Sequence, residues 1–454
     1  MARTLADFLV RLAQHVAKVC IDAFNLALPR GTGIATYGRN LISTLNTLGH
    51  ETHVLYGPSG PIGTDDLINT ISISDPPTPR KRTSKIARWA RTIGAPLGRK
   101  ARLVLRNEDV VWNEAANPAP GAAALWASQQ LFHYAIRAHR MYGVFTPVRF
   151  SGDHQPDVVH WTCPLPLWAP GKINICTLHD LIPLTLPGST SEDRELYLRL
   201  CRGVVDRSDH IFAVSEMTRQ SAIRLLGVDE DRITTTYQSV TAPAKAWSQS
   251  DEATADYIAS VFDLGWKDYF LYFGAIEPKK NVGRILEAYL SSGVASKLII
   301  VSGKSWLDAG EAQVISNVVE SENYLRRGRI EKFDYMSVDA LTQLIRGAKA
   351  TLFPSLYEGF GLPVLESMML GTAVITSTAG SLPEIAGDAA MVVDPYDVDA
   401  IARAIRTLDE DDDRRRFLEV RGRERGQVFS PEAHAAKVDL IYRKLGLHGA
   451  TASD

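Results

Sequence analysis

Short apolar runs rich in β-branched and aromatic residues alternate with longer amphipathic stretches along most of the chain. In the first half, the apolar runs predict strands at Lys18–Phe24, His53–Tyr56, Asp157–Trp161, Asn174–Leu178 and Ile211–Val214. Apolar residues at helical spacing follow the first and the last of these runs, over Ile34–Leu48 and Thr218–Leu226. Strands and helices that alternate in this way are typical of an α/β protein built on parallel sheets.

A second series of the same kind occupies the second half of the chain. Its predicted strands are Tyr269–Phe273, Lys297–Ser302, Ile330–Phe333, Ala350–Phe353, Ala373–Thr376 and Ala390–Val393. The polar stretch from Val240 to Asp256 separates the two series and is interpreted as a linker. A last helix is predicted over Pro431–Leu445, with Ser430 as its N-cap. We therefore expect two doubly wound domains, at residues 1–250 and 251–430, and a C-terminal helix and tail at 431–454.

The composition narrows the class of protein. Of the 454 residues, 45% are hydrophobic and 22% are charged, and the formal net charge is -2. This charge argues against general nucleic-acid binding. No apolar run approaches the roughly 20 residues that a membrane-spanning helix needs. Residues 1–18 predict an amphipathic helix rather than a signal peptide, so we expect a cytoplasmic protein.

The cysteines are few and widely spaced, and they form no Cys-x-x-Cys pair. A chain of this size needs no disulfide framework, and no cluster of cysteine and histidine suggests zinc. We expect buried free thiols at Cys20, Cys163, Cys176 and Cys201.

The segment Ala350–Glu366 carries the strongest chemical signal. An apolar strand runs into a loop that contains Gly359 and Gly361, and a helix follows. Glycines let the backbone approach a ligand closely, and a helix N-terminus attracts a diphosphate. Glu358 in the loop and Glu366 one turn into the helix can accept hydrogen bonds from sugar and ribose hydroxyls. The alternative is a surface glutamate beside one that only stabilises the helix terminus, and the glycine-rich context favours the ligand site.

A lysine-bearing loop follows the predicted strand Tyr269–Phe273. The strand runs into Gly274, and the loop contains the adjacent lysines Lys279 and Lys280. Paired loop lysines are more often only solvated, but both loops are expected at the same edge of one sheet. There a lysine can neutralise phosphate as a point charge.

Two weaker signals lie in the first half. The loop within Pro29–Asn40 contains glycines, but it is no dinucleotide fingerprint and is commonly structural. His179 follows the predicted strand Asn174–Leu178. It can hydrogen-bond sugar hydroxyls near neutral pH, or it can be structural, and the sequence leaves both interpretations open.

At these four segments the chain resembles the retaining glycosyltransferase family 4, which has the GT-B fold, from about Lys18 to Leu445. The Glu-x7-Glu motif of that family stands here as Glu358 to Glu366. Further similar motifs are T-L-H-D at Thr177–Asp180, V-S-E at Val214–Glu216, the E-P-K-K-N loop at residues 277–281, and S-L-P-E-I-A-G-D-A-A at Ser381–Ala390. The resemblance implies two Rossmann-like domains that face each other across a cleft, with the C-terminal helix crossing back to the first domain.

The resemblance also implies roles for single residues. The N-terminal domain would bind the acceptor and the C-terminal domain the nucleotide-sugar donor. Glu366 would bind ribose, Glu358 and His179 would contact the donor sugar, and Lys280 would hold the diphosphate. The catalytic candidates are thus Glu358, His179 and Lys280. Further donor-binding candidates are Gly33 under the diphosphate, Lys279, Ser302 and Gly274, and the backbone of Phe360, Gly361 and Leu362.

Two features of the lysine loop bear on the donor. Many members have arginine after the glycine of the first C-domain strand, but here Ala275 follows Gly274, so Lys279 or Lys304 is expected to replace that phosphate contact. The G-A-I-E-P-K-K-N form resembles mannosyl- and rhamnosyltransferases of bacterial surface polysaccharides. The resemblance therefore implies GDP-mannose as donor, no metal, no other cofactor, and a glycan or polyprenyl-linked glycan as acceptor.

The stretch Arg80–Arg106 contains ten basic residues and no acidic one, interleaved with apolar side chains. Such a cationic amphipathic segment can lie on an anionic membrane surface, or it can be a solvated basic face. The first interpretation predicts a peripheral location on the cytoplasmic membrane.

Two alternatives to a transferase remain open at this stage. One is a GT-B sugar-nucleotide epimerase or phosphorylase, which works without a separate hydroxyl acceptor or depends on inorganic phosphate. The other is a non-catalytic protein that binds a nucleotide-sugar, and the presence of both motif glutamates argues against it.

Overall fold

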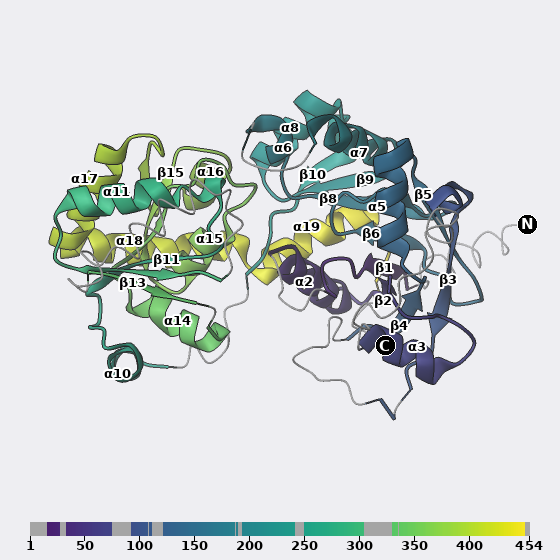
Figure 1. Cartoon of the computed structure of the whole chain (residues 1–454), viewed down its shortest axis with the longest axis horizontal. Coiled ribbons are helices and arrows are strands. Elements are labelled where there is room, and N and C mark those ends of the chain that lie inside the picture. The colour runs from purple at the N-terminus through teal and green to yellow at the C-terminus, as the bar shows by residue number, and fades with distance from the viewer. Residues whose placement is uncertain are drawn as a thin grey trace, which may run out of the picture.

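The protein consists of two lobes, each built on one β-sheet. The computed structural model describes residues 16–27, 33–74, 92–107, 109–110, 121–186, 188, 193–240, 249–303, 329–334 and 336–449. Figure 1 shows the two lobes side by side, with helix α19 (Pro431–Lys444) reaching from the C-terminal lobe into the N-terminal one.

The N-terminal sheet has the strand order β10-β9-β8-β6-β1-β2-β4-β3-β5-β7. Its strands are β1 (Lys18–Asp22), β2 (Glu51–Tyr56), β3 (Arg99–Val104), β4 (Ala124–Ala127), β5 (Thr146–Phe150), β6 (Val158–Trp161), β7 (Leu167–Trp168), β8 (Ile173–Leu178), β9 (His210–Ala213) and β10 (Ile233–Thr235). Each neighbouring pair is parallel except β3 with β4. The sequence predicted β1, β2, β6, β8 and β9. It missed the others because β3 is basic and the remaining four are too short or too weakly patterned.

Helices cover this sheet. They are α2 (Gly33–Thr47), α3 (Asp66–Ser74), α5 (Leu131–Tyr142), α6 (Ile182–Thr185), α7 (Arg194–Arg207) and α8 (Glu216–Leu226). The two predicted helices are confirmed as α2 and α8. The latter ends at Gly227, whose φ of 70° is left-handed and therefore suits glycine.

The C-terminal sheet is fully parallel, with the strand order β13-β12-β11-β14-β15-β16. The strands are β11 (Tyr269–Phe273), β12 (Lys297–Val301), β13 (Ile330–Phe333), β14 (Ala350–Phe353), β15 (Ala373–Ser377) and β16 (Met391–Val393), all within a residue of the prediction. This is the 3-2-1-4-5-6 order of a Rossmann sheet, in which ligands bind where the order reverses. Here that point lies between β11 and β14.

The helices of this domain are α10 (Asp251–Phe262), α11 (Val282–Ser292), α14 (Val338–Gly347), α15 (Leu362–Met369), α16 (Leu382–Ala386), α17 (Val398–Glu410) and α18 (Asp412–Gly426). The predicted linker from Val240 to Asp256 was wrong in its second half, where α10 begins. The reason is a helix cap, because the Ser250 side chain accepts a hydrogen bond from Ala253 N at 3.2 Å.

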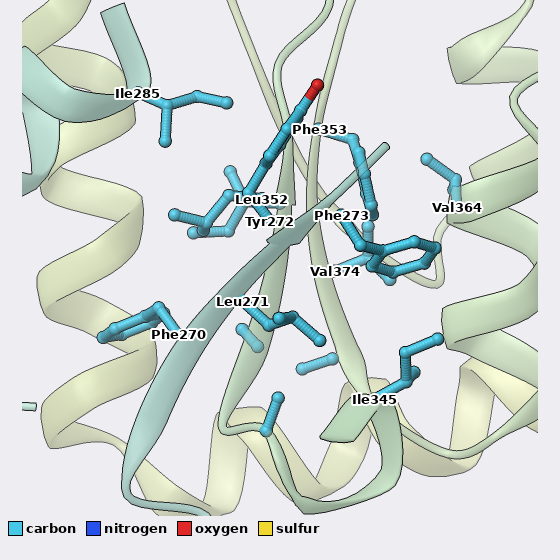
Figure 2. Close-up of a cluster of buried hydrophobic side chains, with 14 of the residues drawn as sticks. Phe270, Leu271, Tyr272, Phe273, Ile285, Ile345, Leu352, Phe353, Val364 and Val374 are labelled. Atoms are coloured by element: carbon cyan, nitrogen blue, oxygen red, sulfur yellow. The ribbon is translucent and has the colours of Figure 1, made fainter. Parts of the chain in front are cut away.

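Strand β11 runs through the middle of the C-terminal core. Figure 2 shows its side chains leaving the strand in alternation, with Phe270 and Tyr272 on the side of Ile285 in α11. Phe273 lies on the other side, with Val364 of α15. All five residues of β11 are buried, which is expected of a strand covered by helices on both faces.

Helix α19 packs into the N-terminal core, where Val438, Ile441 and Tyr442 belong to its hydrophobic cluster. The Tyr442 hydroxyl lies 3.2 Å from His160 Nδ1 of β6. The helix thus ties the end of the chain to the N-terminal sheet. The domain boundaries at 250 and 430 stay predictions.

The cysteine prediction is confirmed, since all four thiols are buried and free. Within the described part of the chain, no helix is both long and apolar enough to cross a membrane. The amphipathic helix predicted at residues 1–18 lies almost entirely outside the described residues.

Candidate functional site

The loops after β11 and β14 form one connected structure at the point where the strand order reverses. Leu356 N donates to Lys279 O at 2.7 Å. Asn281, buried and in the left-handed region with a φ of 63°, donates its amide to Pro354 O at 2.9 Å and to Pro395 O at 2.7 Å. These bonds fix the lysine loop against the glutamate loop, as the sequence predicted for two loops at one sheet edge.

The two loops place Lys280 and Glu358 in direct contact. Lys280 Nζ lies 2.6 Å from Glu358 Oε1, with 17% and 12% of the side chains exposed. Burial favours the neutral acid, but the charges of Lys280 and Lys279 outweigh it and hold the pKa of Glu358 below its ordinary value. Glu358 is therefore ionised at neutral pH. Lys279 makes a looser contact of 3.6 Å to Glu277.

Glu366 of α15, the second glutamate of the motif, has different surroundings. It is half-buried, and no side chain in the described part of the protein forms a hydrogen bond or ion pair with its carboxylate. Burial alone raises the pKa of Glu366 to about 7. The group is thus divided between acid and carboxylate at neutral pH, and it is open to a polar ligand.

The backbone between these glutamates is held through its carbonyl groups. Ser381 donates its hydroxyl to Glu358 O at 3.0 Å and to Phe360 O at 2.9 Å. Ser215 of the other domain donates to the carbonyl between them, Gly359 O, at 2.7 Å. Among the described residues, no acceptor is recorded for the N–H groups of Gly359, Phe360, Gly361 and Leu362. These donors, at the N-terminus of α15, are suited to an anionic ligand.

The N-terminal domain contributes His179 at the end of β8. Its Nε2 lies 2.7 Å from Thr162 O and therefore carries the proton, which leaves Nδ1 as the acceptor. Burial lowers the pKa of His179, so the ring is neutral at pH 7. Tyr37 of α2 meets the ring edge-on at 5.0 Å. Asp22, at the end of β1, accepts a hydrogen bond from Thr162 N at 2.5 Å. This bond holds Thr162, whose carbonyl oxygen is the partner of His179.

Two glycines allow the domains to approach each other here. A Cβ atom on Gly359 would collide with the backbone carbonyl of His179, so this contact between the domains requires glycine. A Cβ atom on Gly33 would meet the Leu362 side chain at 3.2 Å. The structure thus brings Gly33 and His179 opposite the glutamate loop.

The remaining predicted residues border this site or support it. Gly274 has a φ of 132°, which favours glycine, and its N–H donates to Val301 O at 3.0 Å. Ser302 is buried and donates to Gly303 O at 3.1 Å. The ring of Phe360 packs against that of Phe429, with 5.7 Å between the ring centroids. The alternative phosphate contact, Lys304, lies outside the described residues.

The sequence reasoning missed several residues that shape the site. Ser215 and Asp22 each stand at the end of a strand, and that position was a usable signal. Ser381 occurs in a motif noted only for its resemblance, and nothing local marked it as a partner of the glutamate loop. In the described ranges, no three metal-ligating side chains gather in one place.

Comparisons with known proteins identify the family of the chain. The family described as "Glycosyl transferases group 1" matches residues 261–425, and "Glycosyltransferase Family 4" matches residues 130–241. The chain is 34% identical over 276 residues to the O-antigen chain mannosyltransferase B of Escherichia coli, covering 60% of this chain and 70% of that protein. It is 27% identical to the O-antigen chain mannosyltransferase RfbU of Salmonella typhimurium, over 58% of this chain and 67% of that one.

A solved structure supports the same architecture. The sucrose-phosphate synthase of Thermosynechococcus elongatus superposes with a TM-score of 0.64 at 17% identity. The superposition covers 94% of this chain and 99% of that one. Two Rossmann-like domains joined by a returning C-terminal helix constitute the GT-B fold predicted from the sequence.

Proposed function

The chain belongs to glycosyltransferase family 4 and is a glycosyltransferase with the GT-B fold, and from this premise we propose that it transfers mannose from GDP-mannose to a surface polysaccharide. Similarity to two O-antigen mannosyltransferases supports both the sugar and the pathway. It also favours a transferase over an epimerase, a phosphorylase or a non-catalytic binding protein.

One observation carries the proposal: at the point where the sheet order reverses, the Lys280–Glu358 pair adjoins a row of backbone N–H groups that have no acceptor among the described residues. A diphosphate fits these donors and the nearby lysines Lys279 and Lys280. Glu366 then accepts the ribose hydroxyls, and Glu358 and His179 bind the sugar. This assignment of roles stays a proposal for every residue.

In the proposed reaction, a hydroxyl oxygen of the acceptor bonds to the anomeric carbon of mannose on the face that the diphosphate leaves. The bond from that carbon to the phosphate oxygen breaks, and the hydroxyl proton passes to the departing phosphate. Configuration is retained. The lysines and the N–H groups stabilise the charge that develops on the diphosphate, a kind of contribution worth about 10²–10³ in rate for each group.

The donor is tested by thermal shift and transfer assays with GDP-, UDP- and TDP-sugars. We expect GDP-mannose to stabilise the protein most and to be the sugar transferred, with turnover unchanged by EDTA. Preference for a UDP- or TDP-sugar would overturn the donor assignment. Loss of turnover in EDTA would contradict the metal-free mechanism.

The acceptor is proposed to be a lipid-linked glycan at an anionic membrane. Of the basic stretch Arg80–Arg106, residues 80–91 lie outside the described part. The end of the stretch forms β3, which is paired in the sheet while its Lys100 and Arg102 remain exposed. Contact of the stretch with a membrane stays a prediction. Nearby α3 exposes Leu67, Ile68 and Ile71. Flotation with anionic liposomes should recover the protein, and flotation no greater than with neutral liposomes would contradict the proposal.

A further inference from the structure

The first turn of α8 is joined to the opposite domain by a carboxylate of α16. Glu384 Oε1 accepts from Glu216 N at 2.8 Å, and Oε2 accepts from Met217 N at 3.2 Å. These N–H groups are among the four that a helix leaves without internal partners at its N-terminus. Figure 1 shows α8 and α16 on facing sides of the two lobes. Because this charged cap comes from the opposite domain, it forms only when the two domains are in contact.

The same turn of α8 also holds the glutamate loop. Ser215, the N-cap of α8, donates to Gly359 O at 2.7 Å, and Thr218 Oγ1 lies 3.4 Å from the same oxygen. Gly359 directly follows Glu358. Four polar groups at one helix end, two hydroxyls and two N–H groups, thus contact the C-terminal domain at the loop and at α16.

Helix α16 holds that loop from its own side. Ser381, its N-cap, binds the carbonyls of Glu358 and Phe360, and its N–H donates to Glu358 O at 3.1 Å. Ser215 of the other domain donates a hydrogen bond to the carbonyl between these two, Gly359 O. Consequently the carbonyls of Glu358, Gly359 and Phe360 all have hydrogen-bond donors only when α8 and α16 are in contact.

We propose that Glu384 and Ser215 are positioning residues, which couple contact between the domains to the placement of Glu358 against the donor sugar. This inference rests on the proposed role of Glu358. Glu384 is half-buried, and its charge meets the positive end of the α8 dipole, which strengthens both hydrogen bonds. When the domains separate, Gly359 O loses its contact with Ser215, and the first turn of α8 loses the Glu384 carboxylate.

A purely structural cap would behave differently. Ser215 already caps α8 from within, since Thr218 N donates to its hydroxyl at 3.1 Å. Glu384 therefore adds a link between domains rather than the only cap of a helix. Removal of this link should affect turnover more than it affects folding or the binding of nucleotide to the C-terminal domain.

The test uses Glu384→Ala in the full chain, with Asp397→Ala as the matched control. Asp397 caps α17 within the same domain, where its carboxylate accepts from Ala400 N at 2.8 Å. For Glu384→Ala we expect kcat to fall at least about tenfold, since small misplacement of reacting groups is costly. The Kd for the nucleoside diphosphate should change less than about twofold, far below the effect of losing a contact to the ligand. Asp397→Ala should leave kcat unchanged, and Glu384→Gln should recover part of it.

Hydrogen exchange provides a readout that does not depend on the donor. The amides of Glu216 and Met217 should exchange faster in Glu384→Ala, and those of the α17 first turn should exchange faster only in the control. Unchanged exchange at Glu216 and Met217 would show that the contact is absent in solution and overturn the inference. Faster exchange with an unchanged kcat would overturn the positioning role. Failure of the wild type to use GDP-mannose would instead refute the donor proposal, and kcat would then be measured with the sugar that the screen selects.

Discussion

The two glutamates of one short motif have opposite electrostatic surroundings. Glu358 is in contact with Lys280 at 2.6 Å, and its pKa lies below the ordinary value. Glu366, eight residues later, has no partner among the described side chains, and burial raises its pKa to about 7. Burial raises the pKa of both carboxyl groups, and the difference between them comes chiefly from the charges of Lys280 and Lys279 beside Glu358.

This electrostatic difference suits the two glutamates to different roles. A carboxylate that is paired before the ligand arrives stays charged and fixed in direction, which suits contact with a reacting sugar. A carboxylate without a partner is costly to ionise when buried and gains most from a ligand that donates hydrogen bonds to it. Under the proposed roles, the free protein keeps Glu358 ionised and fixed in direction, and the ribose would supply the hydrogen bonds that Glu366 lacks.

The largest effect is expected from removal of the paired carboxylate. Glu358→Ala should lower kcat by about 10³ or more, because the sugar contact and the balance of charge around the lysines are lost together. The measurement is initial-rate transfer with circular dichroism as the check on folding. Near-wild-type activity in a folded variant would remove Glu358 from the site.

A somewhat smaller loss of activity is expected when Lys280, the other member of the ion pair, is replaced. Lys280→Ala should lower kcat by about 10²–10³, since it removes positive charge near the departing diphosphate. It also leaves the buried Glu358 without its closest cation, so the pKa of that carboxyl should rise and turnover should fall as the pH is lowered. Rates measured from pH 5 to 8 test this. A variant with a wild-type pH profile would contradict the coupling of the two side chains.

The contrast also shows where sequence reasoning was sufficient. All six strands of the C-terminal sheet were predicted, and the central strands β11, β14 and β15 were the plainest because fully buried parallel strands are continuous apolar runs. The loops after β11 and β14 identified Lys280 and Glu358. The direct ion pair was not predicted, because spacing along the chain does not fix how two loops meet. Strands such as β3, with three basic residues, carry no apolar pattern, since their sheet position comes from tertiary pairing. Glu384 acts through a contact between domains, which no local pattern encodes.

The unpaired glutamate should make the free protein sensitive to pH. Its pKa is raised from 4.5 to about 7 on folding, so the protonated form favours the folded state. The associated stability is fully present below pH 4.5 and is lost as the pH rises through 7. Glu366→Gln should therefore be more stable than the wild type at pH 8, by up to about 3 kcal/mol, with no difference near pH 4.5. Urea unfolding at the two pH values measures it.

The smallest effect is expected from Glu366→Gln acting on nucleotide binding. A ribose that donates hydrogen bonds to ionised Glu366 lowers its pKa, so nucleotide binding at pH 7 should release a fraction of a proton. Calorimetry in two buffers of different ionisation enthalpy measures that release, and Glu366→Gln should abolish it. The variant should also bind the nucleoside diphosphate about 10–100-fold more weakly, the range for a lost hydrogen bond to a charged group. Proton release that persists in Glu366→Gln would assign it to another group. Glu366 would then be only a buried acid, and the proposed contrast with Glu358 would no longer hold.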